Sequence, residues 1–196
     1  MPTGVALRDV REQLFDAAER VLLREGQNAL TSRAVTAEAG VAKGVLHRHF
    51  ADFDTFLADL VRDRIRRVEH QATALRESAG TGTVERNLGD ALTTLFCSVA
   101  VAIVGLVTAR DTLRAMLRGS GVNGVPVLAE AADMVAAYLG AERDLGRIAP
   151  DADVDTLAMM VIGTGHLLFA GRRPGTAPEA EEIRTVVRAL LIGVAR

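Results

Sequence analysis

The chain has 196 residues and a mass of 20.8 kDa, which suits one large domain or two small ones. Hydrophobic residues make up 49% and charged residues 24%, so the chain is not disordered, collagen-like or of low complexity. The net charge of −2 excludes a basic protein that coats nucleic acid indiscriminately, and one cysteine excludes an intramolecular disulfide. The absence of Trp and the 4% aromatic content favour helices over a β-sandwich.

The first part of the chain contains four predicted helices. Apolar residues recur at helical spacing over residues 7–24, and Gly26 ends this helix because glycine readily adopts the left-handed conformation. Short helices are expected over residues 32–39 and 42–49, and a longer one over residues 52–75. No stretch alternates polar and apolar residues in the way that predicts a half-buried strand.

Segments rich in glycine and proline divide the rest of the chain into further helices. These are expected over residues 84–110, 111–118, 127–146, 152–170 and 179–195. The predicted fold is therefore all-α, with about nine helices and no strands.

Residues 91–109 form an uncharged stretch of 19 residues, which is close to the length of a membrane span. Its threonines and its serine, the absence of a second such segment, and the lack of a polybasic flank favour a helix buried in a soluble domain. We therefore expect no membrane partner, and we expect Cys97 to be a buried, inert thiol. Charged residues throughout the first 25 positions exclude an export signal, which predicts a cytoplasmic protein.

Residues 31–50, TSRAVTAEAGVAKGVLHRHF, read as two short helices joined by a tight turn, which is what a helix-turn-helix requires. Thr31 or Ser32 caps the first helix, where Val35 can face Leu46 of the second. The glycine between the two helices can supply the positive φ of the turn. This pattern predicts a pair that packs at a wide angle instead of one long helix.

The outward face of the second helix is basic. Lys43 and His47 lie four residues apart on one side, and no acidic residue occurs between Glu38 and Asp52. Such a helix suits a DNA major groove, and Arg33 could hold the DNA backbone alongside. A helical hairpin with a solvated basic face fits the charges equally well, because residues 1–50 carry seven basic and six acidic side chains.

The first fifty residues resemble the DNA-binding domain of the TetR family of bacterial transcriptional regulators. That family opens with a helix ending in glycine, as in AAERVLLREG, and continues through a Thr-capped helix, an Ala-Gly-Val turn and Lys-Gly-x-Leu-Tyr-x-His-Phe. The residues in register with this pattern are Thr31, Arg33, Ala39, Gly40, Val41, Lys43, Gly44, Leu46, His49 and Phe50.

This resemblance implies a DNA-binding domain over residues 1–51 and a helical domain for ligand binding and dimerisation over residues 52–196. The chain would bind double-stranded DNA, with base contacts from Lys43, Val45 and Arg48. The expected DNA-contacting residues are Thr31, Ser32, Arg33, Ala42, Lys43, Gly44, Val45, His47, Arg48 and His49.

Three positions depart from the family pattern. His47 replaces the usual tyrosine of the recognition helix and gains charge at acidic pH, which predicts pH-sensitive binding. Phe53 stands where the family often has a phosphate-binding lysine, and Ala42 replaces a common serine or threonine. We expect weaker or differently distributed phosphate contacts.

The C-terminal part would form a homodimer and bind a small-molecule effector, by similarity to the family. Apolar faces on the last two helices, among them Leu157, Val161 and Leu168, suit a four-helix interface or the chain's own core. A mostly apolar cavity predicts a hydrophobic or amphipathic effector. Its expected lining residues, which could equally be core, are Leu60, Leu92, Phe96, Met116, Met134 and Tyr138.

Together these patterns predict a homodimeric repressor that binds an inverted-repeat operator and is released by its effector. We expect no cofactor, no metal and no enzymatic activity, because the sequence shows no nucleophile or acid–base pair at suggestive spacing. The alternative is a helical small-molecule or lipid-binding protein without operator binding.

Overall fold

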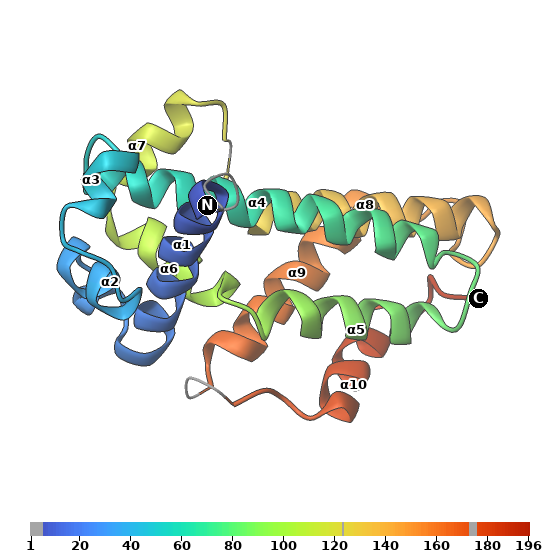
Figure 1. The fold of residues 1–196 in the computed structure, drawn as a ribbon. Coiled ribbons are helices and arrows are strands. Elements are labelled where there is room, and N and C mark those ends of the chain that lie inside the picture. Colours follow the sequence, from blue (N-terminus) through green and yellow to red (C-terminus); the bar gives the residue numbers. More distant parts are fainter. Residues whose placement is uncertain (1–5, 123, 173–175) are drawn as a thin grey trace. The chain divides into compact units, whose positions relative to one another are not determined.

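The computed structural model describes residues 6–122, 124–172 and 176–196. These residues form ten α-helices and one short 3-10 helix, which confirms the predicted all-α fold (Figure 1). The only β-type pairing among them is an isolated bridge between Ile148 and Ala195. The α-helices are α1 (Ala6–Glu25), α2 (Ser32–Glu38), α3 (Val45–His49), α4 (Phe53–Glu77), α5 (Val84–Phe96), α6 (Ala100–Ala109), α7 (Asp111–Gly119), α8 (Leu128–Asp144), α9 (Val154–Ala170) and α10 (Ala180–Leu190).

The helices group into two compact units. The N-terminal unit combines the described residues up to Arg62 with Gly105–Val122, and the C-terminal unit combines Asp63–Val104 with the described residues that follow Val122. The N-terminal unit therefore includes α7 as well as the helices around the predicted helix-turn-helix. The functional division after residue 51 remains a prediction.

Aromatic rings dominate the core of the N-terminal unit. Phe15 of α1 lies 5.9 Å from Phe50 and 5.6 Å from Phe56, measured between ring centroids. Phe50 and Phe56 meet edge to face at 5.0 Å, a favourable geometry for aromatic pairs. Leu14 and Leu46 are fully buried around them. This core joins α1, the end of α3 and the beginning of α4.

The C-terminal unit packs α9 against α8, α5 and α10. Gly165 of α9 allows the close approach to α5, because a Cβ atom there would lie 2.9 Å from both Leu92 Cδ2 and Phe96 Cε2. Phe96 in turn contacts Phe169 at 5.4 Å between centroids. A glycine at this helical position thus sets how tightly α5 and α9 pack.

The uncharged stretch 91–109 does not form the single helix that we predicted. It divides into α5 and α6, which are bent by 54° about residues 97–99. Cys97 lies at this break and is exposed, so the prediction of a buried thiol was wrong. No single helix in the described part of the chain is long and apolar enough to span a membrane, although the bent pair passes by length and composition.

Two further helices are shorter than predicted. The last helix ends at Leu190, and the chain then turns at Gly193, which has a φ of 83°, so that Ala149 can donate its N–H to the carbonyl of Val194. The second helix of the helix-turn-helix begins at Val45 instead of residue 42.

Candidate DNA interface

The helix-turn-helix lies within the N-terminal unit and forms as its sequence predicts. Thr31 caps α2, because its hydroxyl oxygen accepts a hydrogen bond from the N–H of Ala34 at 3.1 Å. The turn after α2 places Gly40 at a φ of 66°, which glycine adopts without strain. Gln13 of α1 donates to the carbonyl of Ala39 at 2.8 Å and so fixes the end of α2.

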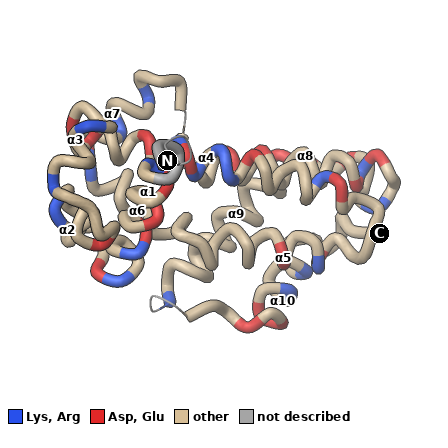
Figure 2. Tube along the Cα trace, viewed as in Figure 1, with Lys and Arg blue, Asp and Glu red and all other residues tan. Residues whose placement is uncertain are grey.

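The second helix, α3, is short and is entered through a turn. The N–H of Val45 donates to the carbonyl of Ala42 at 2.9 Å, and Lys43 and Gly44 form the turn between them. Leu46 is fully buried against the core, whereas His47 and Arg48 are exposed. Figure 2 marks the Lys and Arg positions along the backbone trace of this region. The helix therefore exposes a basic face while its apolar face is anchored.

Most of the predicted DNA-contacting side chains are exposed. Val45 and His49 are partly buried at the edge of the face. Ser32 differs from the other predicted DNA-contacting residues, because its hydroxyl oxygen is buried and has no hydrogen-bond partner. Any contact from Ser32 to phosphate would use its backbone. The exposed residues are Thr31, Arg33, Ala42, Lys43, Gly44, His47 and Arg48.

The one acidic side chain within residues 31–51 is held by α1. Glu38 accepts hydrogen bonds from Arg20 Nε at 2.7 Å and from Arg24 Nη2 at 2.9 Å. These bonds, the one from Arg20 first, lower the pKa of the Glu38 carboxyl. Its charge is therefore balanced locally beside the basic face.

Arg11 of α1 joins the end of α3 to α4, a role that the sequence analysis did not find. Its guanidinium lies 4.3 Å from the ring centroid of Phe50 and 2.7 Å from Asp59 Oδ2. It also donates to the carbonyl of His49 at 3.4 Å. The sequence gives no signal for this role, since Arg11 reads as an ordinary polar residue beside the apolar stripe of its helix.

The same chain of contacts continues to the end of α7. Arg62 contacts the other carboxylate oxygen of Asp59 at 2.8 Å and donates to Ser120 Oγ at 3.1 Å. Arg110 adds a second link, since it lies 3.6 Å from Asp54 and 5.9 Å from the ring centroid of Phe53. The segment 105–122 is thereby tied to the helices that hold α3.

Phe53, which replaces the family's lysine, packs against the core. Its ring stacks on Phe56 with centroids 5.6 Å apart. The beginning of α4 is capped instead by Asp52, whose carboxylate accepts the N–H of Thr55 at 2.6 Å. This bond lowers the pKa of Asp52. The structure thus gives Phe53 a packing role at the start of α4.

The six predicted effector-contacting residues fall into both units. Leu60 and Met116 belong to the N-terminal unit, whereas Leu92, Phe96, Met134 and Tyr138 belong to the C-terminal unit. Met134 lines a cavity of about 260 Å³ there, between α4, α5 and α8. The shared lining of one cavity by all six residues remains a prediction.

Tyr138 belongs to a buried polar network in the C-terminal unit. Its hydroxyl donates to Glu142 Oε1 at 2.6 Å and accepts from Asn87 Nδ2 at 3.0 Å. Burial, followed by the bond to Glu142, raises the pKa of Tyr138. Glu142 is fully buried and also contacts Arg147 at 3.3 Å and the N–H of Gly80 at 3.2 Å.

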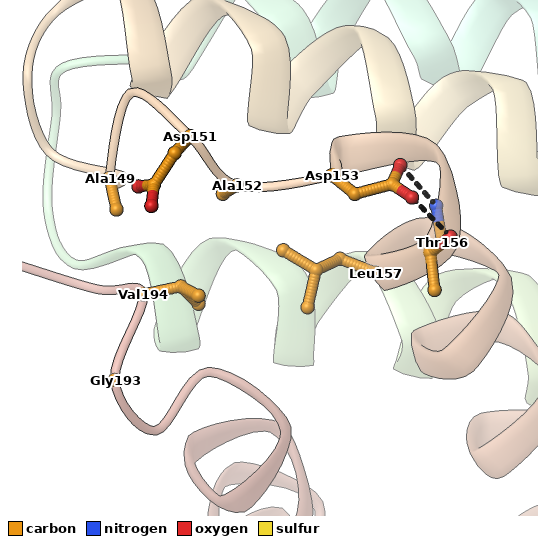
Figure 3. A pocket seen from close by; sticks show the side chains of 8 residues that line it. All are labelled: Ala149, Asp151, Ala152, Asp153, Thr156, Leu157, Gly193 and Val194. Atoms are coloured by element: carbon orange, nitrogen blue, oxygen red, sulfur yellow. Dashed lines mark hydrogen bonds between the residues drawn. The ribbon is translucent and has the colours of Figure 1, made fainter.

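A second cavity, of about 300 Å³, lies at the beginning of α9 (Figure 3). The Asp153 carboxylate caps α9, because it accepts both the N–H and the hydroxyl of Thr156, at 3.1 and 2.6 Å. Asp151, Leu157 and Val194 contribute to its walls. Within the described residues, no three His, Cys, Asp or Glu side chains gather in a way that could hold a metal ion.

An exposed basic helix, presented by a capped helix and a glycine turn on an all-helical scaffold, defines a helix-turn-helix protein. Residues 14–59 match the model of the bacterial regulatory proteins of the tetR family. An uncharacterized HTH-type transcriptional regulator of Haemophilus influenzae is 38% identical over 52 residues, a match that covers 26% of this chain and 28% of that protein. The N-terminal part of the chain, over residues 14–59, is therefore similar in sequence to the regulators of the TetR family.

Solved structures share the fold along nearly the whole chain. The fatty acid degradation regulator FadR from Bacillus halodurans has a TM-score of 0.69 at 19% identity and covers 93% of this chain and 95% of its own. A putative TetR-family regulator from Mesorhizobium loti has a TM-score of 0.67 at 15% identity, covering 96% and 98%. FadR from Bacillus subtilis in complex with stearoyl-CoA has a TM-score of 0.63 at 19% identity, covering 93% and 98%.

Proposed function

We propose that the chain is a homodimeric transcriptional repressor that binds an inverted-repeat operator and is released by a hydrophobic or amphipathic effector. Residues 1–51 would bind DNA, and residues 52–196 would bind the effector and form the dimer. The observation that carries the proposal is the exposed basic face of α3, which is fixed by Arg11 and by the capped α2.

DNA binding follows from the side chains on that face. Lys43 and Arg48 are exposed and carry the positive charge that phosphates and base edges attract. His47 is exposed beside them and can donate a hydrogen bond to phosphate. Phosphate contacts would supply most of the affinity, and Lys43, Val45 and Arg48 would supply the base contacts.

Dimerisation is supported by an apolar face of α9 that nothing in the described chain covers. Met159 is 68% exposed and Leu167 is 74% exposed, with Met160 and Gly163 between them on the same side of the helix. Figure 2 shows α9 almost entirely without charged residues. The predicted stripe differs, since Val161 is buried within its own chain. A second copy covering this face would form the two-fold dimer that an inverted repeat requires.

The test is a selection of bound fragments from a random duplex pool at low and moderate salt, using the full chain. Enrichment of an inverted repeat is expected, and a variant with Lys43→Ala and Arg48→Ala should lose it. A variant at the exposed Arg86 of α5, Arg86→Ala, is the matched control for loss of positive charge. Recovery of unrelated fragments that elute with salt, equally by all three proteins, would contradict the proposal.

A further inference from the structure

The exposed side of α9 is symmetric about one glycine. Met159 and Leu167 lie four residues before and four residues after Gly163, and both are large, apolar and well exposed. Gly163 is exposed as well, and a Cβ atom added to it would have no atom from another element of the described chain within 4 Å. Residues four apart lie one above the other on a helix, so these three residues form one face. We call it the Gly163 face.

The same symmetry continues to the ends of the helix. Thr156 and Ala170 lie seven residues before and seven residues after Gly163, and both are small and exposed. The sequence from 156 to 170 contains no aspartate, glutamate, lysine or arginine. A face without charge is not repelled by a copy of itself, and equal spacing about its centre lets an antiparallel copy match it position by position. Both features indicate a second copy of this chain as the occupant of the Gly163 face.

The other side of α9 packs within its own unit, and Val161 is fully buried there. A Cβ atom on Gly165 would press on Leu92 and Phe96 of α5, so that glycine permits a close contact between two helices. Gly163 has no such neighbour in the described chain, although a glycine inside a helix destabilises it relative to alanine. A second helix that approaches closely at Gly163 would give this glycine the role that α5 gives to Gly165.

We infer that the two copies of α9 in the dimer cross antiparallel at Gly163, with the two-fold axis beside this residue. The missing side chain lets the two backbones approach closely at the crossing. Met159 of one copy then contacts Leu167 of the other, and the symmetry repeats this contact on the far side of the axis. The inference rests on the proposed function, because it specifies how the proposed homodimer forms.

Cross-linking of single-cysteine variants of the full chain tests this register. The natural cysteine is exposed, so all variants carry Cys97→Ser. Met159→Cys and Leu167→Cys are produced separately and together, with two different affinity tags, and are then oxidised. We expect a disulfide only in the mixed dimer, because the two copies of residue 159 lie about 12 Å apart along the helix axes. A disulfide of Met159→Cys with itself, or a dimer in which the mixed variants do not link, would overturn the inference.

Gly163→Leu tests how closely the two helices approach. A leucine at the crossing holds the helices apart, so the dissociation constant of the dimer, measured by sedimentation, should rise about tenfold. A loose contact would respond in the opposite direction, because leucine adds apolar surface to the face. Gly140→Leu of α8 is the matched control and should leave the dissociation constant as it is, because a Cβ added there also has no atom from another element within 4 Å. Circular dichroism confirms that each variant is folded, and tighter dimerisation of Gly163→Leu would overturn the close crossing.

Sedimentation and cross-linking together separate this inference from the proposed function. A stable dimer that lacks the mixed disulfide would overturn the crossing at Gly163 and leave the proposed dimeric repressor intact. A chain that stays monomeric at the concentrations at which it binds the operator would contradict the proposed dimer and, with it, the inference.

Discussion

The two compact units are stabilised by different chemistry. The N-terminal unit contains four of the chain's six phenylalanines, at positions 15, 50, 53 and 56, together with arginines that lie against their rings. The C-terminal unit relies mainly on aliphatic helix packing, with one phenylalanine pair, Phe96 and Phe169, one close glycine contact and one buried carboxylate. The first arrangement fixes the direction of a short helix, whereas the second leaves room for a cavity beside a polar network.

The largest effect that we expect concerns the buried carboxylate of the C-terminal unit. Glu142→Ala would leave Arg147, Tyr138 and the N–H of Gly80 without their shared partner. Breaking a buried ion pair in this way costs about 3 kcal/mol or more of unfolding free energy. Urea unfolding measures it, with the exposed Asp133→Ala of the same helix as control. Equal stability of the two variants would show that the network contributes little.

The close contact between α5 and α9 gives the next largest effect. Gly165→Ala would press a methyl group against Leu92 and Phe96, and we expect a loss of about 2 kcal/mol in unfolding free energy. Gly140→Ala is the matched control, because a Cβ added at that helical glycine would have no atom from another element within 4 Å. The control should stabilise the chain slightly, by about 0.5 kcal/mol. A stabilising Gly165→Ala would contradict the packing described here.

Arg11 tests whether the N-terminal unit positions its recognition helix. Arg11→Ala removes the contacts to Phe50, Asp59 and the His49 carbonyl. We expect about tenfold weaker binding to the selected operator, while binding to random duplex and the salt dependence stay unchanged. Fluorescence anisotropy measures both duplexes across a salt series. An equal loss on both would mean that Arg11 acts only through the stability of the unit.

Lys43 should differ from Arg11 in its salt dependence, because it would place a positive charge against the DNA itself. Lys43→Ala is expected to weaken binding severalfold and to lower the salt slope by about one unit. The same anisotropy series measures it, with Arg86→Ala as the control. An unchanged slope would remove Lys43 from the interface.

The smallest effect concerns pH and His166 of α9. Burial lowers the pKa of His166 below the ordinary 6.5, so the unfolded chain binds a proton more readily than the folded one. Stability is therefore expected to fall as pH drops below about 6.5, until the folded chain is protonated too. His166→Gln should reduce the change in the free energy of urea unfolding between pH 7.5 and 5.5, whereas the exposed His70→Gln should leave that change as it is. An unchanged slope in His166→Gln would contradict this.

Local signals in the sequence account for the helix-turn-helix. The capping threonine, the glycine turn and the buried Leu46 follow from rules that act over a few residues, and each appears as predicted. The break at residues 97–99 could not be predicted, because apolar residues continue through it and only tertiary packing decides where such a stretch bends.

The contacts of Arg11 could not be predicted either, because they too depend on tertiary packing. Arg11 and Asp59 are 48 positions apart, and nothing near either residue indicates that they pair. For the predicted effector residues, helical spacing placed Leu60 and Met116 beside apolar neighbours, yet spacing carries no information about which unit they join. The structure shows these pairings between residues that are distant in the sequence.

Binding to a spacing series of the selected operator tests the central claim most directly. Two recognition helices held by one dimer require half-sites about one helical turn apart. Inserting five base pairs, about half a turn, between the half-sites should therefore reduce affinity to that of a single half-site. Affinity that is unchanged by the insertion would mean that the two helices are not held by one dimer, and it would contradict the account.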